Sequence, residues 1–241
     1  MTSAALPRAL PSARGYFVTG TDTGVGKTRI AVALIHALRA RGLRVAGMKP
    51  VAAGHAPGEL NEDVVALMQA ANVTADVRDV NPYVFEPAIA PHIAAAQAGV
   101  RIDLDVIRAA YARLAARTDA VVVEGAGGWR VPLGEREDLA DLAQALGLPV
   151  VLVVGLRLGC LNHALLTAES IARRGLAWGG WVGNAIDPDM RCRSENVEAL
   201  KTRLPGPCLR IFSYQPIWDA SGRSAETLVL PNLLVSKNTH E

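Results

Sequence analysis

One segment near the start of the chain restricts its possible folds more than any other. Residues 15–28 read Gly-Tyr-Phe-Val-Thr-Gly-Thr-Asp-Thr-Gly-Val-Gly-Lys-Thr, which is an apolar strand, a glycine-rich turn and the first turn of a helix. The helix continues with apolar residues on one face, at Ile30, Ala33, Leu34, Ala37 and Leu38. A strand that passes through Gly-Lys-Thr into an amphipathic helix is typical of proteins that hold a nucleoside triphosphate. We therefore expect a nucleotide-binding α/β fold.

Each part of this phosphate loop (residues 20–28) has an expected task. Backbone N–H groups converge on the phosphates at the helix N-terminus, and glycine lets the backbone approach because it has no Cβ. The N–H groups in question belong to Gly24, Val25, Gly26 and Lys27. The side chain of Lys27 is expected to bridge the terminal phosphates, and the hydroxyl of Thr28 to hold Mg²⁺. The loop is a variant, because Thr21 stands where the usual spacing places the first glycine.

Short apolar segments alternate with amphipathic ones along the rest of the chain. Those predicted as strands are 16–19, 44–48, 120–124, 150–154, 180–182 and 209–212. Those predicted as helices are 28–41, 62–71, 104–117, 137–146, 163–174 and 194–204. The strands are rich in β-branched residues and almost continuously apolar, as in a parallel sheet covered on both faces. The expected fold is a P-loop NTPase-like α/β domain. It has a mostly parallel sheet flanked by helices on both faces, with ligands at the carboxyl ends of the strands.

We expect one domain over residues 15–241. A length of 241 residues with 50% hydrophobic content suits a single large α/β domain, and no linker or internal repeat marks a boundary. Residues 1–14 are expected to be a disordered leader, with a short transit peptide as the alternative. The proline-containing stretch 81–91 is expected to extend over the ligand site.

Charge and cysteine content narrow the class of partner. The formal net charge is +2, from 25 basic and 23 acidic residues spread along the chain, which gives no electrostatic case for nucleic acid or an anionic membrane. Small molecules are the expected partners. The cysteines Cys160, Cys192 and Cys208 suit neither a disulfide framework nor a metal knuckle, so we predict free thiols in a reducing compartment. No run of eighteen apolar residues occurs, and we expect a soluble, cytoplasmic protein.

Three charged residues outside the loop are candidates for the chemistry. Glu124 ends an apolar strand and precedes Gly-Ala-Gly-Gly, which favours contact with a metal or nucleotide over a solvated acid at a strand end. Lys49 also follows a strand and precedes a proline, which holds it extended, so it is expected to stabilise charge during phosphoryl transfer. Asp63 is ambiguous. In Asn-Glu-Asp the pattern alone favours an acid in the first turn of a capped helix.

Several polar residues at helix starts and strand ends leave two interpretations open. Asn162 could be the N-cap of the helix expected from His163, or part of an anion site made by free N–H groups. Asn184 could be a turn residue or an amide that reads a base edge. For His92 and His163 a structural role is favoured over that of a base. Tryptophans are expected in the core or in subunit contacts, at Trp129, Trp178, Trp181 and Trp218.

Seven blocks of sequence, in order, carry a resemblance to a known family. They are Gly-Thr-Asp-Thr-Gly-Val-Gly-Lys-Thr at 20–28, Lys-Pro-Val-Ala-Ala-Gly at 49–54, Asn-Pro-Tyr-Val-Phe at 81–85, Ala-Pro-His-Ile at 90–93, Val-Glu-Gly-Ala-Gly-Gly-Trp at 123–129, Leu-Gly-Cys-Leu-Asn-His-Ala at 158–164 and Gly-Trp-Val-Gly-Asn at 180–184. This ordered set resembles the ATP-dependent dethiobiotin synthases, from about residue 15 to residue 207. The resemblance implies a biotin-pathway enzyme that converts 7,8-diaminononanoate, CO₂ and ATP·Mg²⁺ to dethiobiotin, ADP and phosphate.

The resemblance also implies roles for individual residues. Lys27 and Lys49 would be catalytic, neutralising charge on the phosphoryl group and on a carbamate, while the Mg²⁺ ligands would be Thr28, Asp63 and Glu124. This replaces the helix-cap interpretation of Asp63. Substrate contacts would come from Lys49, Ala53, Cys160, Leu161 and Asn162, the last three across a homodimer interface. ATP contacts would come from Thr23, Gly24, Val25, Gly26, Lys27, Thr28, Arg29, Asp63, Glu124, Gly125, Ala126, Gly127, Asn184 and Ala185, with Asn184 reading adenine.

The chain departs from the family pattern in two places. Ala53 stands where relatives carry Ser or Thr beside the substrate, so only a backbone contact can remain there. Residues 208–215 replace the usual Gly-x-Ile-Pro-Trp-like segment near the nucleotide base. Two alternative functions are less well supported by the sequence. A corrin-acid ligase of the same fold usually carries a glutaminase domain, for which the chain has no room. A partitioning or septum-positioning switch usually has a second lysine early in the loop, where this chain has Thr21.

Overall fold

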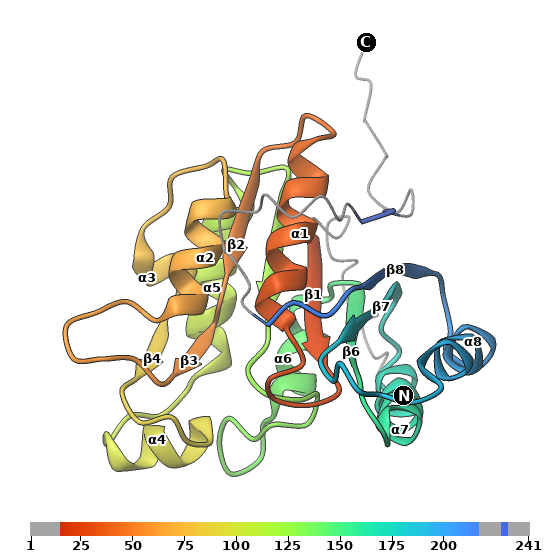
Figure 1. Cartoon of the computed structure of the whole chain (residues 1–241). Coiled ribbons are helices and arrows are strands. Elements are labelled where there is room, and N and C mark those ends of the chain that lie inside the picture. The colour runs from red at the N-terminus through yellow and green to blue at the C-terminus, as the bar shows by residue number, and fades with distance from the viewer. Residues whose placement is uncertain (1–14, 217–227, 231–241) are drawn as a thin grey trace, which may run out of the picture.

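The computed structural model describes residues 15–216 and 228–230, and its centre is a parallel sheet (Figure 1). The strands of this sheet are β1 (Gly15–Gly20), β2 (Val45–Met48), β5 (Ala120–Glu124), β6 (Val150–Leu156), β7 (Trp178–Ala185) and β8 (Cys208–Phe212). They are ordered β2-β5-β1-β6-β7-β8, and every neighbouring pair is parallel. The leader expected over 1–14 and Trp218 lie outside the described residues.

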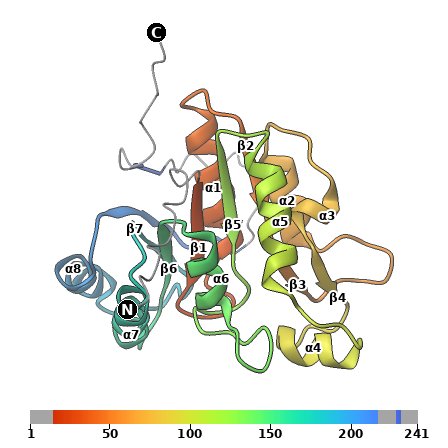
Figure 2. The same cartoon turned by 180° about the vertical axis from the view of Figure 1, so that it is seen from behind.

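Helices cover both faces of the sheet, as predicted (Figures 1 and 2). One face carries α1 (Lys27–Arg39) and α2 (Glu62–Ala70), whose Leu34 and Leu67 pack in one core cluster with Val18 of β1. The other face carries α5 (Leu104–Ala115), α6 (Leu139–Leu146), α7 (Cys160–Arg173) and α8 (Arg193–Arg203). Adjacent residues of β1 point to opposite faces, so Phe17 belongs to the second cluster.

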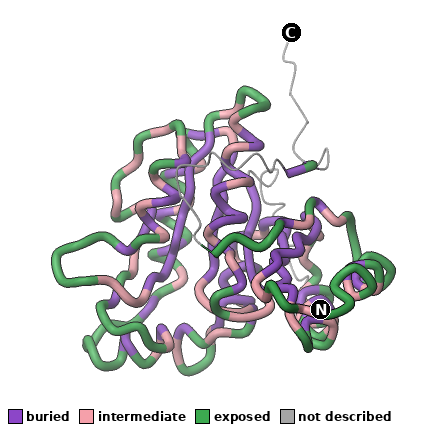
Figure 3. The backbone as a smooth tube through the Cα atoms, viewed as in Figure 1, coloured by how far each residue is buried: buried purple, intermediate pink, exposed green. Residues whose placement is uncertain are grey.

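Burial explains why the strands could be found from the sequence. Every residue of β1, β2, β5 and β6 is buried, which Figure 3 shows as a continuous purple centre. A strand buried on both faces favours apolar residues at nearly every position, and this produces the almost continuous apolar runs seen in the sequence. Trp129 and Trp181 are buried in the core as expected, and Trp178 packs partly buried against it. The three cysteines are unpaired, also as predicted.

Four short elements lie between β2 and α5 and have no counterpart in the predicted set. They are β3 (Val51–Ala53), α3 (Val77–Val80), β4 (Tyr83–Phe85) and α4 (Pro91–Gln97), and β3 pairs with β4 as a small parallel sheet. None is long enough to show a period in the sequence. Asn81 connects them to the large sheet, because its side-chain amide donates to the carbonyl oxygens of Lys49 (2.6 Å) and Tyr83 (2.9 Å).

Two predicted elements have an end that lies three residues from the observed one, and glycine is involved in both cases. Helix α7 begins at Cys160 rather than His163, because Gly159 adopts the left-handed conformation of its N-cap (φ 93°). Asn162 therefore lies inside the first turn and is not the N-cap. Strand β7 runs from Trp178 to Ala185 rather than 180–182, so Asn184 lies in the strand and not in a turn. Gly183 also lies in this strand, and a larger residue would not fit there, because a Cβ would lie 2.7 Å from the side chain of Ile211 in β8.

The order of strands fixes where ligands can bind. The chain leaves β1, at the middle of the sheet, to reach β2 at one edge, and later returns to β6 on the other side of β1. Ligands of such open sheets bind at the carboxyl ends of the strands, near this reversal. The phosphate loop, Lys49 and Glu124 all lie at these ends. Among the described residues, no helix has both the length and the apolar character that a membrane crossing requires.

Candidate active site

The phosphate loop joins β1 to α1 and takes a conformation that requires glycine. Gly24 and Gly26 have φ angles of 73° and 89°, in the left-handed region. Gly26 is the N-cap of α1 and no side chain caps the helix, so the N-terminal N–H groups remain available to an anion. A Cβ on Gly26 would lie 2.3 Å from the side-chain nitrogen of Asn184, whereas one on Gly24 would meet nothing within 4 Å.

The departure at Thr21 has a structural counterpart. The backbone N–H of Thr21 donates to the carbonyl of Val153 in β6 at 3.0 Å, which extends the pairing of β1 with β6 by one residue. The carboxylate of the next residue, Asp22, accepts from the backbone N–H of Thr23 at 2.7 Å and from the guanidinium of Arg157. The start of the loop is therefore attached to the end of β6.

Lys27 lies across its own loop. Its Nζ donates to the carbonyl oxygen of Asp22 at 3.0 Å. Burial, and then the positive charge of Lys49, lower the pKa of Lys27 to about 8, although the nearby carboxylates oppose the shift. With this pKa, Lys27 is still mostly protonated at neutral pH, and an anion placed beside it would favour the charged form further.

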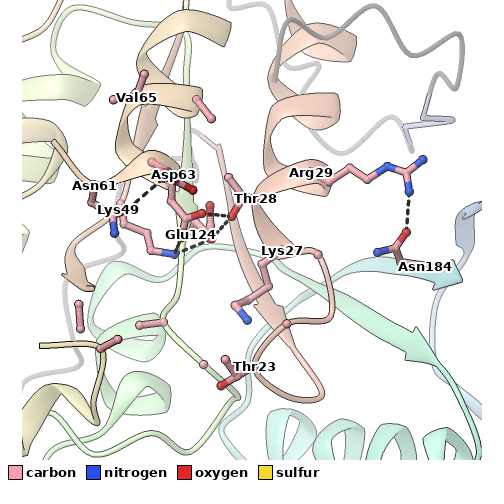
Figure 4. A pocket seen from close by; sticks show the side chains of 18 of the residues that line it. Thr23, Lys27, Thr28, Arg29, Lys49, Asn61, Asp63, Val65, Glu124 and Asn184 are labelled. Atoms are coloured by element: carbon pink, nitrogen blue, oxygen red, sulfur yellow. Dashed lines mark hydrogen bonds and ion pairs between the residues drawn. The ribbon is translucent and has the colours of Figure 1, made fainter. Parts of the chain in front are cut away.

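A second cluster lies beside the loop and contains a hydroxyl, two carboxylates and an ammonium group (Figure 4). Thr28 Oγ1 donates toward Asp63 Oδ1 at 2.6 Å and lies 2.9 Å from Glu124 Oε1. Lys49 Nζ donates to Asp63 Oδ2 at 2.7 Å and to Glu124 Oε1 at 2.5 Å. The four side chains come from α1, α2, the end of β2 and the end of β5, so the fold brings together residues that are far apart in sequence.

Both interpretations of Asp63 prove compatible. Asn61 is the N-cap of α2, and its side chain accepts from the backbone N–H of Asp63 at 3.1 Å. The side chain of Asp63 is thereby free of capping and reaches the cluster instead. Asp63 is a first-turn acid and a member of the site at once.

Burial and charge decide the protonation of the cluster. Burial alone would lower the pKa of Lys49, but the carboxylates of Glu124 and Asp63 outweigh it and raise that pKa above its ordinary value. Burial likewise opposes ionisation of Asp63, yet the charge of Lys49 and the hydrogen bonds hold its pKa below the usual range. Burial raises the pKa of Glu124, with Lys49 opposing the shift. Lys49 and Asp63 thus form a charged pair at neutral pH.

The donor set fits a magnesium ion. Glu124 is 1% exposed, and its Oε2 is a buried oxygen with no hydrogen-bond partner among the described residues. Such an atom needs a ligand to balance its desolvation. Mg²⁺ prefers oxygen ligands and is usually bound through one or two carboxylates, with water and phosphate completing its shell. Thr28, Asp63 and Glu124 could hold it beside the phosphate loop.

These residues face one cavity of 1310 Å³. The predicted site residues that line it are Thr23, Gly24, Gly26, Lys27, Thr28, Arg29, Lys49, Ala53, Asp63, Glu124, Ala126, Gly127, Asn184 and Ala185. Val25 and Gly125 do not line it, although their carbonyl oxygens accept from Asn184 (2.9 Å) and Lys49 (3.5 Å). His92 and His163 are not among the lining residues either.

The chain does not bring the start of α7 to this cavity. Cys160 is buried in the core, Leu161 is partly buried, and Asn162 is exposed on the surface. None of the three lines the cavity. Their expected contact with substrate therefore needs a second copy of the chain.

Several lining residues were missed by sequence reasoning. Glu59, Leu60 and Val131 gave no signal, because a single side chain in a loop has no pattern. The stretch 88–91 and the residues 214–216 also line the cavity. These lie in or next to segments that the sequence had marked, the proline-containing excursion and the stretch that departs from the family pattern.

Comparisons with known proteins agree on the family. A family model described as an AAA domain matches residues 14–220. A protein of Nitrosospira multiformis is 54% identical over 88% of this chain and 93% of its own length, and one of Aromatoleum aromaticum is 54% identical over 83% and 91%. One of Xanthomonas euvesicatoria is 51% identical over 90% and 97%. All three carry the name ATP-dependent dethiobiotin synthetase BioD.

Solved structures show the same fold at low identity. A MinC:MinD cell division complex of Aquifex aeolicus aligns with TM-score 0.53 and 17% identity, over 88% of this chain and 86% of that one. A ParA family ATPase of Chlorobium tepidum aligns with TM-score 0.51 and 12% identity, over 85% and 86%. These similarities confirm the P-loop NTPase-like architecture and carry no information on the reaction.

Proposed function

The chain belongs to the family of ATP-dependent dethiobiotin synthetases, and we propose that it closes the ureido ring of dethiobiotin from 7,8-diaminononanoate, CO₂ and ATP. It is an ATP-dependent ligase of biotin biosynthesis. The products are dethiobiotin, ADP and phosphate. We also propose that residues 15–241 act as one catalytic domain and that the reaction takes place in the cytoplasm.

One observation carries the proposal. Lys49 Nζ, Thr28 Oγ1 and the two carboxylates of Asp63 and Glu124 meet within hydrogen-bond distance at the side of the phosphate loop. A nucleotide-binding loop alone would support hydrolysis or switching. A buried second lysine, fixed between acids next to that loop, supplies a positive charge for another acceptor of the phosphoryl group.

The nucleotide would lie along the cavity with its phosphates at the N-terminus of α1. The N–H groups of the loop and Lys27 would bind the phosphates, and Lys27 would exchange its bond with Asp22 for the terminal phosphate. Magnesium, held by Thr28, Asp63 and Glu124, would neutralise phosphate charge when bound. The side chains of the protein would bind and orient the substrates and neutralise their charge.

The chemistry would proceed in three balanced steps. One substrate amine adds to CO₂ and loses a proton, which forms a carbamate. A carbamate oxygen attacks the γ-phosphorus and the bond to ADP breaks, which gives a carbamic-phosphoric anhydride. The second amine attacks its carbonyl carbon, phosphate leaves, and a proton is released as the ring closes. Lys49, whose pKa is raised by the carboxylates of Glu124 and Asp63 despite its burial, would remain charged and stabilise the carbamate and the transferring group.

The carboxylate tail of the substrate would be bound by a second subunit. In the first turn of α7 the N–H of Cys160 donates to the carbonyl of Arg157 at 3.0 Å, whereas no side chain caps the N–H groups of Leu161 and Asn162, and Asn162 is exposed. These groups suit a carboxylate. Because they do not line the cavity of their own chain, we propose a homodimer in which each α7 serves the neighbour's site. In place of a hydroxyl, Ala53 would offer the substrate only its backbone.

Product detection tests the function directly. The purified protein should convert diaminononanoate, ¹³C-bicarbonate and Mg·ATP to dethiobiotin that is one mass unit heavier, with one ADP formed per ring. Lys49→Gln should lower the rate at least about a hundredfold, the usual size of one preorganised electrostatic contact. The matched control is Lys201→Gln, because Lys201 pairs with Glu198 on the exposed surface of α8. ATP turnover without labelled product would refute the proposal.

A further inference from the structure

A buried arginine stands at the end of the cavity away from Lys49. Arg29, one residue beyond Thr28 in α1, is 6% exposed. Its Nη1 donates to the side-chain oxygen of Asn184 at 3.0 Å and to the carbonyl oxygen of Ser213 at 3.0 Å. Its guanidinium carbon lies 4.8 Å from the centre of the Phe212 ring. Figure 4 shows this pair on the opposite side of Lys27 from the carboxylate cluster.

Asn184 is held at both ends of its amide. Its oxygen accepts from Arg29, and its Nδ2 donates to the carbonyl of Val25 in the phosphate loop at 2.9 Å. A guanidinium can only donate and a carbonyl can only accept. If the amide rotated by 180°, its NH₂ group would face the N–H donor of Arg29 and its oxygen would face the carbonyl oxygen of Val25, and both hydrogen bonds would be lost. The two partners therefore fix which end of the amide is oxygen and which is nitrogen.

A fixed amide distinguishes bases that a rotating amide would accept equally. Each amide end has one hydrogen-bonding position left, an acceptor on the oxygen and a donor on the nitrogen. Adenine presents an exocyclic donor beside a ring acceptor, and an asparagine can bind that edge in a bidentate manner. Hypoxanthine and guanine present an exocyclic acceptor beside a ring N–H, which matches the amide only after it rotates.

We propose that Arg29 is a positioning residue that fixes the amide of Asn184 and thereby makes the nucleotide site select adenine over 6-oxopurines. The inference rests on the proposed function in that it takes a nucleoside triphosphate as the ligand of this cavity. Arg29 also holds the wall of the base site, because it binds Ser213 and stacks on Phe212, next to the lining residue Tyr214. Residues 208–215, the segment that departs from the family pattern, are thus attached to α1 through Arg29.

The experiment compares two substitutions that differ in what they can offer the amide. Arg29→Gln can either donate or accept, so it permits rotation, whereas Arg29→Lys can only donate. Binding of ATP, ITP and inorganic tripolyphosphate is measured by calorimetry without diamine, and kcat and KM are measured separately. Arg39→Met is the matched control, since Arg39 ends the same helix and donates to the carbonyl of Ala70 at 2.6 Å, away from the lining residues.

The wild-type chain should bind ITP at least about tenfold more weakly than ATP, the usual effect of one mismatched hydrogen bond to a charged network. Arg29→Gln should reduce that ratio about tenfold through a weaker ATP affinity, with tripolyphosphate affinity unchanged. Arg29→Lys and Arg39→Met should keep the preference for ATP. Binding of tripolyphosphate also shows that each variant is folded.

Three results would overturn the inference. The first is an unselective wild-type chain, which requires no variant. The second is an ATP-to-ITP ratio unchanged in Arg29→Gln, and the third is an equal loss of tripolyphosphate affinity, which would place the effect of Arg29 on the phosphate loop. Failure of the proposed function looks different, because the chain would then form no dethiobiotin while its base preference could still be measured.

Discussion

The charge of Lys27 depends on the groups that lie beside it. Burial and the neighbouring Lys49 lower its pKa to about 8. A triphosphate would favour the ammonium form and raise that value. Binding should therefore be strongest below about pH 8 and weaken as the pH rises above it, by at most about tenfold per pH unit.

The first prediction follows from this sign. At pH 9, ATP binding should take up a proton, because the nucleotide restores the charge on a lysine that is mostly neutral in the free protein. Calorimetry in two buffers of different ionisation enthalpy measures the uptake. Lys27→Arg should show none, since a guanidinium keeps its proton at this pH. If the wild-type chain binds ATP at pH 9 without proton uptake, the shifted pKa is not that of a phosphate-binding lysine.

Asp63 separates a structural acid from a metal ligand. Asp63→Asn should weaken the dependence of the reaction on Mg²⁺, because an amide keeps the shape and loses the charge that attracts a hard cation. A rightward shift of the magnesium titration is the expected result. Because Asp63 belongs to the cluster with Lys49, Asp63→Asn should lower the reaction rate more strongly than it lowers the free energy of unfolding.

A closely matched control exists in α5. Asp105 occupies the same position after its N-cap as Asp63, and its backbone N–H donates to the cap residue Asp103 just as that of Asp63 donates to Asn61. Asp105→Asn should cost a few tenths to about one kcal/mol of stability and leave the magnesium titration unaltered. If Asp63→Asn behaves in the same way, Asp63 is only a first-turn acid.

At the residue scale the sequence indicated which side chains would gather at the carboxyl ends of the strands better than it indicated their individual contacts. Lys27, Thr28 and Lys49 come after strands and Glu124 ends one, and their meeting at one edge follows from the parallel sheet. Asp63 could not be assigned from its own pattern, because a capped first turn and a metal ligand use the same residue type. The contacts of Arg29 could not be predicted at all, since they depend on the position of a distant segment around Ser213.

At the scale of elements, the phosphate loop depends on its two glycines for different reasons. Gly26→Ala would place a Cβ 2.3 Å from the Asn184 amide nitrogen as well as straining the backbone. Gly24→Ala would meet nothing within 4 Å and only strain a left-handed φ, at about 1–2 kcal/mol. Nucleotide binding should therefore be lost in the first variant and largely kept in the second.

Titration calorimetry with ATP, together with thermal unfolding, measures both effects. Gly24→Ala serves as the control for strain, because it shares the conformation but not the contact with β7. Equal loss of ATP affinity in the two variants would mean that backbone strain, rather than the approach of Asn184, explains the requirement for glycine.

The long elements were predictable and the short ones were not. A buried strand or an amphipathic helix of three turns carries a period that a sequence can show. β3 and β4 have three residues each, and their pairing joins segments on either side of α2 and α3, so nothing local specifies it. The start of α7 was misplaced because Gly159 caps it through backbone conformation, which leaves no side-chain signature.

At the scale of the whole molecule, the proposed dimer makes the most specific prediction. Asn162→Asp places a negative charge at an exposed position in the first turn of α7 and should raise the KM for diaminononanoate by repelling its carboxylate. ATP affinity should stay the same. Mixed with an inactive Lys27→Ala chain at low diamine concentration, it should form dimers in which one site carries both lesions and the other neither.

Recovery of activity at about half of the sites in those mixed dimers is the expected outcome for a composite site. If Asn162 acted within its own chain, each site of the mixed dimer would carry one lesion and no activity would return. Mass spectrometry of intact complexes confirms that mixed dimers have formed, and the rate is then measured on the same sample.

The strand order also has a consequence for how the molecule is made. Phe17 of β1 pairs with Val123 on one side and Val150 on the other, so the strand that carries the phosphate loop has no neighbouring strand until β5, near the middle of the 241-residue sequence, has been synthesised. Contacts between such distant segments form late, after the entropy of closing long loops has been overcome. The phosphate loop is thus synthesised early, but the strand that carries it is paired only later. A nascent chain that ends before β5 has no partner for β1, and its apolar strands are the surface that chaperones would be expected to protect during synthesis.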